Sequence, residues 1–188
     1  MLYVIRHGKT DWNNRKKTMG RMDLPLCPEG IAQAHEMKDK LKYNNFDLIM
    51  CSPLTRAKET AKIINEGKDI EIVYDQRLLE RNLANLEGRS YPEDNDRLWD
   101  INVNADDFYI ETMEEFKDRV YDFMDDIKKS YDDKNILVVT HGGVTALINC
   151  YFDGTLYDGP ITDKFLDNCE IESFNMKKAR NKVYTPNE

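Results

Sequence analysis

Two short apolar runs, each ending in a histidine followed by glycine, constrain the fold of this chain more than any other feature. The first is residues 2–5, followed by Arg6-His7-Gly8, and the second is residues 136–139, followed by Thr140-His141-Gly142-Gly143. Continuous apolar runs of this length are typical of strands buried on both faces of a parallel sheet. The chain has only three histidines, and two of them lie at such strand ends. Since parallel strands end at one edge of a sheet, we expect both imidazoles to share a site there.

The segment after residue 27 has the pattern of an amphipathic helix. Pro28 suits the first position of a helix, because its missing N–H would have no partner there. The following apolar residues repeat every three or four positions, which predicts one buried face: Ile31, Ala34, Met37 and Leu41. His35 falls in the middle of this helix, and we interpret it as a structural or surface residue.

Three further helices are expected from their start signals. Ser52 is a good N-cap and Pro53 a good first residue for one of them. Thr112 and Glu115 form a capping box at the start of the next. The last begins near residue 142, directly after the second histidine-terminated strand.

Strands are expected at 46–51, 70–74, 135–140 and about 170–176, in addition to the first. Strands that alternate with helices predict an α/β fold, a three-layer α/β/α sandwich with a mostly parallel sheet. We expect a single domain over residues 1–188. Residues 11–27 are interpreted as a long loop over the carboxyl edge of the sheet, and residues 75–111 as an irregular, partly helical excursion or lid over the same edge.

Composition excludes several classes of function. The formal net charge of −8 argues against nonspecific binding of nucleic acid or anionic membranes. No apolar run approaches the length of a membrane span, and the chain begins with a strand, so we expect a cytoplasmic protein without a signal peptide. The scattered cysteines favour reduced thiols over disulfides or a zinc site: Cys27, Cys51, Cys150 and Cys169.

Cations and histidines converge on the carboxyl edge of the predicted sheet. Arg6 and His7 end the first strand, Arg56 lies in the first turn of the helix that follows Ser52, and His141 precedes a Gly-Gly helix start. Arginines, helix N-termini and glycine-rich turns together predict a phosphate site. A neutral imidazole in that site can attack phosphorus, while the arginines stabilise the transferring oxygens without a metal or other cofactor.

Five ordered motifs resemble the histidine phosphatase superfamily, the phosphoglycerate mutase-like proteins. The resemblance runs from residue 2 to about residue 176. It rests on these segments: Arg6-His7-Gly8 with Thr10 and Trp12-Asn13; Gly20-Arg21 with Asp23 and Pro25-Leu26; Ser52-Pro53-Leu54-Thr55-Arg56-Ala57; Leu79-Glu80 with Leu86-Glu87-Gly88; and Val139-Thr140-His141-Gly142-Gly143.

The resemblance implies a phosphoglycerate mutase-like fold and a metal-independent phosphomonoesterase that acts on small phosphorylated metabolites. It implies that His7 is phosphorylated and that Glu80 first protonates the leaving oxygen and then activates water. Arg6 and Arg56 would bind the phosphoryl group, and His141 would complete the pocket. The remaining positions implied for binding phosphate or substrate are Thr10, Asn13, Gly20, Arg21, Arg81 and Gly142.

Two alternatives stay open at this point. Glu80-Arg81-Asn82 is close to the Glu-Arg-His of the mutases, which keeps phosphoglycerate mutase-type phosphoryl transfer possible, although the chain lacks the insertion that encloses the substrate in cofactor-dependent mutases. Met19 stands where relatives usually have Gln or Thr, which keeps a catalytically weak phospho-ligand-binding module possible. The expected edge strand near 170–176 also leaves a homodimer open.

Overall fold

The computed structural model of the chain describes residues 1–91, 96–100, 109–155 and 159–178. The strands of this part are β1 Leu2–Arg6, β2 Leu48–Cys51, β3 Ile72–Tyr74, β4 Ile136–Thr140 and β5 Ile171–Phe174. The α-helices are α1 Asp11–Asn14, α2 Pro28–Lys40, α3 Thr55–Asn65, α4 Met113–Ser130 and α5 Gly142–Asp153. Short 3₁₀ turns lie at Gln76–Leu78, Ala84–Leu86, Asp96–Trp99, Thr162–Lys164 and Met176–Lys178.

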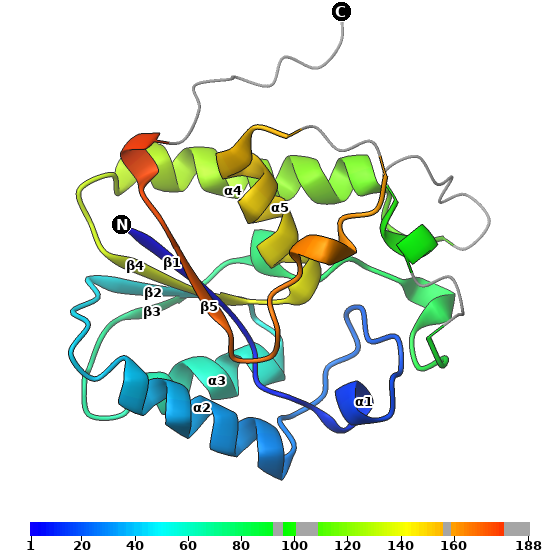
Figure 1. Cartoon of the computed structure of the whole chain (residues 1–188), viewed down its shortest axis with the longest axis horizontal. Coiled ribbons are helices and arrows are strands. Elements are labelled where there is room, and N and C mark those ends of the chain that lie inside the picture. The colour runs from blue at the N-terminus through cyan, green and yellow to red at the C-terminus, as the bar shows by residue number, and fades with distance from the viewer. Residues whose placement is uncertain (92–95, 101–108, 156–158, 179–188) are drawn as a thin grey trace, which may run out of the picture.

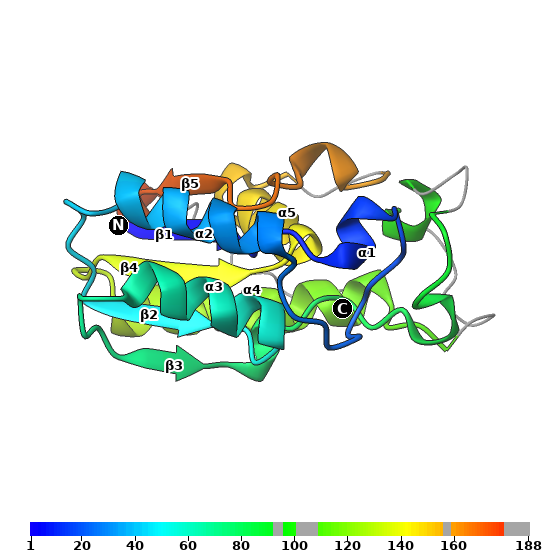
Figure 2. The same ribbon diagram turned by 90° about the horizontal axis from the view of Figure 1, so that it is seen from below.

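The strands form one sheet in the order β3-β2-β4-β1-β5, which Figure 2 shows behind α2 and α3. The first four strands are parallel, and β5 pairs antiparallel with β1 at one edge. This arrangement confirms the predicted α/β fold with a mostly parallel sheet. It also explains the two apolar runs, because β1 and β4 are interior strands that are paired on both sides and covered on both faces.

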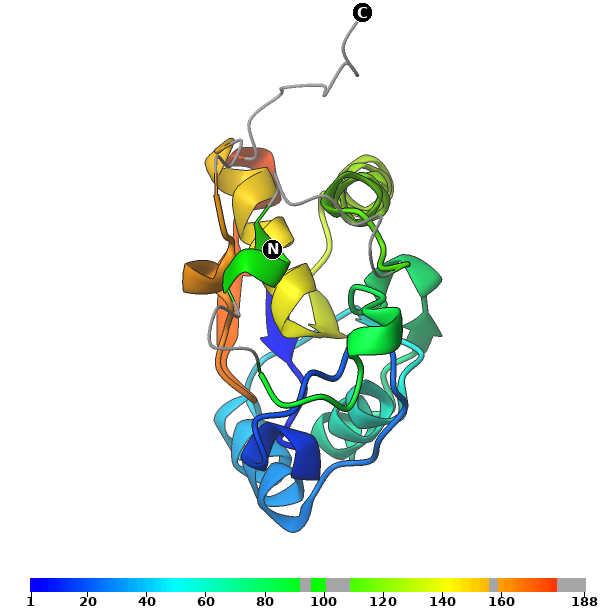
Figure 3. The same ribbon diagram turned by 90° about the vertical axis from the view of Figure 1, so that its right-hand side faces the viewer.

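Helices cover both faces of the sheet, α4 and α5 on one face and α2 and α3 on the other (Figures 1 and 3). Alternate residues of β1 contribute to opposite cores. Leu2 and Val4 pack in the core that contains residues of α4 and α5, whereas Ile5 packs with α2 and α3. The predicted α/β/α layering is therefore confirmed.

The predicted buried face of α2 is wrong at its first residue. Ala34, Met37 and Leu41 are buried, but Ile31 is 42% exposed. The cause is the backbone of Gly30, which lies directly against the backbone of Gly8 and Lys9. This close approach fixes the first turn of α2 so that Ile31 is directed to solvent.

The predicted start of α3 at Ser52-Pro53 is also wrong. The helix begins at Thr55, and Leu54 at the N-cap position provides no side-chain hydrogen bond. The carboxylate of Asp23 accepts hydrogen bonds from the Thr55 backbone N–H at 2.6 Å and from Thr55 Oγ1 at 2.9 Å. A residue distant in sequence therefore caps this helix, which local start signals cannot reveal.

Residues 11–27 are not wholly loop, because α1 occupies their first turn. Thr10 is the N-cap of α1, and its side chain accepts from the backbone N–H of Asn13. The Asn13 side chain in turn accepts from the Thr10 backbone N–H at 2.9 Å, so that Asn13 takes the place of the usual Glu or Gln in a capping box.

The described part of residues 75–111 lies with α1 at the end of the sheet where β1 and β4 finish (Figures 1 and 2). It is joined to the loop after α1 by backbone hydrogen bonds, Thr18 N–H to Arg89 O at 2.9 Å and Gly88 N–H to Thr18 O at 2.8 Å. The role of this segment as a lid stays a prediction, as does the single-domain boundary. Its residues 92–95 and 101–108 lie outside the described residues.

Several expectations concern the molecule as a whole. Within the described residues, no helix combines the length and apolar character that are needed to cross a bilayer. The four cysteines are free and buried. No group of three or more His, Cys, Asp or Glu in the described part of the chain is arranged to hold a metal ion. A homodimer formed through the edge strand β5 stays a prediction.

Candidate active site

The register of the sheet brings the two histidines together. Arg6 pairs with Thr140 in the parallel β1–β4 ladder, and the His7 backbone N–H donates to Thr140 O at 2.9 Å. His7 and His141, the next residues of the two strands, therefore lie side by side, with ring centroids 5.2 Å apart. Both side chains are buried. The shared site expected from the two apolar runs is thus present at the carboxyl edge of the sheet.

The partners of each imidazole define which of its nitrogens carries hydrogen. His7 Nδ1 lies 2.7 Å from the carbonyl oxygen of Gly8, which can only accept, so Nδ1 carries the hydrogen. His7 Nε2 then has a free lone pair and accepts from Arg56 Nε at 3.1 Å. His141 Nδ1 accepts from the same Arg56 Nε at 3.2 Å, while its Nε2 donates to Ser52 Oγ at 2.7 Å.

Arg56 is held between the histidines and the loop after α1. It is the second residue of α3 and is buried. Its Nη1 donates to Met22 O at 2.7 Å and its Nη2 donates to Gly20 O at 2.8 Å. Burial lowers the pKa of Arg56 to about 10, which still leaves it charged at neutral pH.

Arg6 supplies a second cation to the same cavity. Its Nη1 donates to Leu166 O at 2.8 Å, which fixes the guanidinium group. Its Nε is buried and has no hydrogen-bond partner in the described part of the chain. A buried, unpartnered N–H in the wall of a cavity is costly unless a ligand completes its hydrogen bonding. This N–H is a candidate contact for an anion.

Both histidines are neutral in this environment. Burial is the largest cause that lowers the pKa of His7 well below its ordinary value, and the charges of Arg56 and Arg6 lower it further. The pKa of His141 is lowered well below its ordinary value by the same burial and by Arg56. A neutral imidazole whose lone pair faces cations is suited to attack an electrophile that those cations bind.

The pKa of Glu80 is shifted upward, whereas the pKa values of the two histidines are shifted downward. Glu80 is buried, and its Oε1 and Oε2 accept from the backbone N–H groups of Arg81 at 3.0 Å and Gly143 at 3.1 Å. Burial raises the pKa of Glu80, although these hydrogen bonds and the charges of Arg56 and Arg6 oppose the rise. A carboxyl with a raised pKa is suited to donate a proton near neutral pH.

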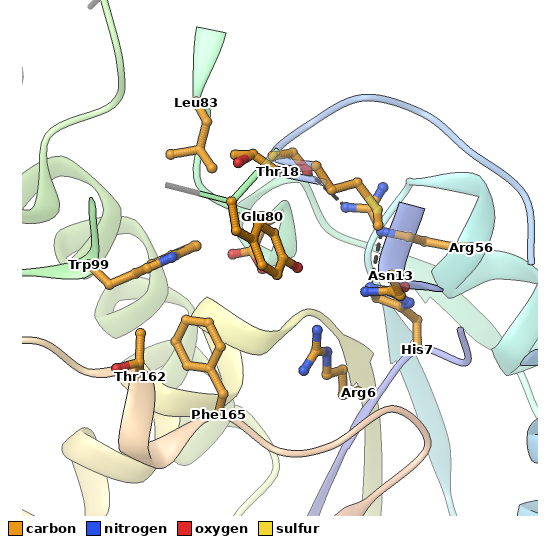
Figure 4. A pocket seen from close by; sticks show the side chains of 13 residues that line it. Arg6, His7, Asn13, Thr18, Arg56, Glu80, Leu83, Trp99, Thr162 and Phe165 are labelled. Atoms are coloured by element: carbon orange, nitrogen blue, oxygen red, sulfur yellow. Dashed lines mark hydrogen bonds between the residues drawn. The ribbon is translucent and has the colours of Figure 1, made fainter. Parts of the chain in front are cut away.

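A cavity of about 290 Å³ connects these groups. Figure 4 shows Arg6, His7, Asn13 and Arg56 at one end, apolar and aromatic side chains at the other, and Glu80 between them. The cavity therefore has a cationic end for an anion and an apolar end for another part of a ligand. Its lining residues are Arg6, His7, Asn13, Thr18, Met19, Gly20, Arg56, Glu80, Leu83, Tyr91, Trp99, Thr162 and Phe165.

Some residues predicted to bind phosphate line the cavity, and others support it from behind. Asn13 and Gly20 line it. Thr10 is buried and does not line it, because its hydroxyl donates to Asn13 Oδ1 at 3.0 Å. The Met19 sulfur lies 3.8 Å from Thr10 Oγ1, so a thioether occupies part of the wall beside the cations.

The structure places Arg21, Arg81 and Gly142 away from the cavity lining. Arg21 donates from Nε to the carbonyl oxygen of Glu80 at 3.1 Å. Arg81 is fully buried and donates to the backbone carbonyls of Glu111 and Leu98. A side chain at Gly142 would contact Phe165, so this glycine permits close packing of the helix start. Neither Arg21 nor Arg81 lines the anion end, whereas Gly142 packs beside it, since a Cβ there would lie 3.4 Å from Arg6 Cζ.

Sequence reasoning missed Ser52 and Gly143 as functional residues. Ser52 was interpreted as a helix cap, but its hydroxyl orients His141 instead. The sequence predicts Gly143 only as part of a Gly-Gly helix start, yet its N–H donates to Glu80 Oε2. Gly143 follows Gly142 directly and Ser52 lies four positions before Arg56, and this nearness in sequence was the only available signal. For Phe165 and Thr162 the sequence carried no signal. His35 is exposed on α2, as expected.

Comparisons with known proteins agree with this geometry. The model of the histidine phosphatase superfamily (branch 1) matches residues 2–188. The chain is 38% identical over 139 residues to "Uncharacterized phosphatase PhoE" of Bacillus subtilis (strain 168), covering 74% of this chain and 70% of that protein. It is 32% identical over 148 residues to "Probable phosphoglycerate mutase GpmB" of Escherichia coli O1:K1, covering 75% of this chain and 69% of that protein. The solved structure "Bacillus stearothermophilus YhfR" superposes with a TM-score of 0.75 at 29% identity, covering 84% of this chain and 81% of that chain.

Proposed function

Because this chain belongs to branch 1 of the histidine phosphatase superfamily, we propose that it is a phosphatase that hydrolyses small phosphorylated metabolites through a phosphohistidine on His7. The observation that carries the proposal is the His7 ring itself. Its Nδ1–H is tied to Gly8 O, its Nε2 lone pair faces Arg56, and its pKa is lowered well below the ordinary value by burial and by neighbouring cations. This is the state that a nitrogen nucleophile requires.

In the first step, Arg6 and Arg56 bind the phosphoryl oxygens of the substrate at the cationic end of the cavity, together with His141. The Nε2 lone pair of His7 attacks phosphorus, and the bond from phosphorus to the leaving oxygen breaks. Glu80, whose pKa burial raises, gives its proton to the leaving oxygen. The arginines stabilise the charge that develops on the transferring oxygens.

In the second step, the Glu80 carboxylate removes a proton from water, and the resulting hydroxide attacks the phosphorus of phosphohistidine. The N–P bond breaks, its electron pair returns to His7 Nε2, and inorganic phosphate leaves. Glu80 regains its proton, so both groups are ready for another cycle. The apolar end of the cavity, which includes Trp99 and Phe165, receives the leaving group.

Replacing the nucleophile tests this proposal. We expect His7→Ala to lower hydrolysis of 4-nitrophenyl phosphate by about a thousandfold or more, since the variant lacks the imidazole that forms the covalent intermediate. Initial rates of nitrophenol release measure the effect. His35→Ala is the matched control, because this histidine is exposed on α2, and it should keep full activity.

Chemical trapping tests the intermediate directly. Mass spectrometry of enzyme quenched at alkaline pH during turnover should locate a phosphoryl group on His7. Added chelators should leave the rate unchanged. Full activity in His7→Ala, or a rate that depends on added metal, would contradict the mechanism. A protein that binds phosphate esters but never acquires a phosphoryl group would instead support the binding-module alternative.

Phosphoglycerate mutase activity is the second candidate. It is favoured by the identity to a probable phosphoglycerate mutase and by the Glu80-Arg81-Asn82 sequence. Incubation with 3-phosphoglycerate and a catalytic amount of bisphosphoglycerate separates the two activities. We expect release of free phosphate without isomerisation, because a site that is not enclosed by an insertion admits water to phosphohistidine. Formation of 2-phosphoglycerate would overturn this preference.

The cavity, the net charge and the cysteines support the remaining expectations about binding partners and cellular location. The cationic cavity favours a small phosphorylated ligand, while the net charge of −8 disfavours nucleic acid and anionic membranes. We also expect a cytoplasmic protein, since four free cysteines fit a reducing compartment.

A further inference from the structure

We propose that Glu111 is the positioning residue for the general acid: through Arg21 and Arg119 it holds the backbone of Glu80 in place for transfer of a proton to the leaving oxygen. This inference rests on the proposed function. It also gives Arg21 a role other than the direct contact with phosphate that the sequence predicted.

The carboxylate of Glu111 accepts hydrogen bonds from two guanidinium groups, those of Arg21 and Arg119. Its Oε2 accepts from Arg21 Nη2 at 3.1 Å and from Arg119 Nη2 at 2.9 Å, and its Oε1 accepts from Arg119 Nε at 2.6 Å. The Asn82 backbone N–H also donates to Oε2, at 3.0 Å. The Glu111 and Arg119 side chains are only 11% and 16% exposed, so their ion pair is largely desolvated, whereas Arg21 joins it from a side chain that is 34% exposed.

Both guanidinium groups then bind the same carbonyl oxygen, that of Glu80. Arg21 Nε lies 3.1 Å from it and Arg119 Nη2 lies 3.0 Å from it. Arg119 Nη1 also donates to the carbonyls of Arg77 and Leu79, each at 2.7 Å. The backbone that carries the acid is therefore fixed by side chains from the loop after α1 and from α4.

The main chain of Glu111 adds two contacts to the same segment. Its N–H donates to Asn82 O at 2.9 Å, and its carbonyl accepts from Arg81 Nε at 2.7 Å. Both residues that follow Glu80 are thus bound to one residue distant in sequence. The carboxyl of Glu80 is left facing Gly143 and the cavity.

The pKa values of Glu111 and Glu80 are shifted in opposite directions. Burial favours the neutral form of Glu111, but hydrogen bonds and charge from Arg119 outweigh it and lower the pKa of Glu111. Burial raises the pKa of Glu80. One carboxylate thus stays charged and neutralises the arginines, while the other stays able to donate a proton. A shift of the acid by about 1 Å is enough to cost on the order of a hundredfold in rate.

A series of phenyl phosphates that share one aromatic ring, but whose leaving groups differ in pKa, tests the proposal. The probes are 4-nitrophenyl, phenyl and 4-methoxyphenyl phosphate, and kcat/KM reports the step that forms phosphohistidine. A phenolate that is already a good leaving group needs little help from an acid. We expect Glu111→Gln to change kcat/KM for the nitrophenyl ester by less than about 3-fold, and to lower it for the methoxyphenyl ester by about 30-fold or more.

Controls separate positioning from simple loss of structure. Glu114→Gln is the matched control, because Glu114 is an exposed carboxylate three residues along, in the first turn of α4, and it should match the wild type with every ester. Glu80→Gln should give the same dependence on the leaving group with a larger loss. If Glu111→Gln does not fold, Arg21→Lys carries the test, since lysine keeps the charge but lacks the Nε donor to Glu80.

Two results would overturn the inference. One is an equal loss for all three esters in Glu111→Gln, which would indicate a structural role alone. The other is an unchanged dependence on the leaving group in every variant of this network. Neither result would remove the proposed function, which stands on phosphohistidine formation by the wild-type protein.

Discussion

Gly143 shows how one residue without a side chain shapes the site. A Cβ at this position would lie 2.6 Å from Glu80 Oε1, 2.5 Å from Trp99 Cζ3 and 3.0 Å from Phe116 Cε1. Real Cβ atoms do not approach other atoms so closely, so an added methyl group must displace its neighbours. The displaced groups include the candidate acid and the aromatic wall of the cavity.

We therefore predict that Gly143→Ala lowers kcat by about a hundredfold through displacement of Glu80. Overpacking should also lower the free energy of unfolding by about 1–3 kcal/mol. Steady-state kinetics and urea denaturation measure the two effects. Gly67→Ala is the control, because Gly67 has φ +78° and nothing lies within 4 Å of a Cβ there. That variant should lose stability by about 1 kcal/mol and keep its activity. Wild-type kcat in Gly143→Ala would contradict the prediction.

At the scale of elements, the N-terminus of α3 depends on a loop that is remote in sequence. Asp23 caps the helix at Thr55, the residue directly before Arg56. The same loop supplies the carbonyls of Gly20 and Met22 that bind the Arg56 guanidinium. The start of α3 and the Arg56 side chain are therefore held by one segment.

Removing this cap should affect both stability and binding. We predict that Asp23→Ala lowers the free energy of unfolding by about 1 kcal/mol and raises KM more than it lowers kcat, because Arg56 loses its support. Asp23→Asn keeps an acceptor oxygen and should retain most of the stability. Urea denaturation and initial rates over a range of substrate concentrations provide the measurement. Equal KM values for the alanine variant and the wild type would show that the cap does not position Arg56.

At the scale of the whole molecule, the buried neutral histidines make stability depend on pH. Burial lowers the pKa of His7 and of His141 in the folded state. Below about pH 6.5, the ordinary pKa of histidine, the unfolded chain binds protons at these residues and the folded chain does not. Stability therefore decreases as pH falls, by at most about 1.4 kcal/mol per pH unit for each histidine.

Protonation of Glu80 has the opposite effect on the free energy of unfolding over part of this pH range. Its pKa is raised in the folded state, so between its ordinary pKa and the raised value the folded chain binds the extra proton, and stability increases as pH falls. We predict a net decrease in the free energy of unfolding from pH 7.5 to pH 5.5, measured by urea denaturation. A variant that carries both His7→Asn and His141→Asn should show a flatter profile, and an identical slope would contradict the assignment.

The sequence by itself indicated the fold class, the strands and the long helices apart from the start of α3, and it singled out the residues proposed for the anion end. Apolar runs without alternation placed β1 and β4 inside the sheet, and the parallel direction of the strands placed His7 and His141 at one edge; that β1 and β4 are neighbours in register is seen only in the structure. Buried strands and helix faces follow from periodicity, which is a local property of a chain, whereas strand pairing is not. The family resemblance rests on ordered motifs, and the comparisons confirm it.

Only the tertiary structure decided which supporting contacts hold the site. Arg21 binds Glu80 and Glu111 rather than lining the cavity, Ser52 orients His141 rather than capping a helix, and Asp23 supplies that cap from another segment. Each of these side chains can make several hydrogen bonds of similar strength. The choice among them is made by partners 32 to 90 positions away, whose distances are fixed only when the layers pack.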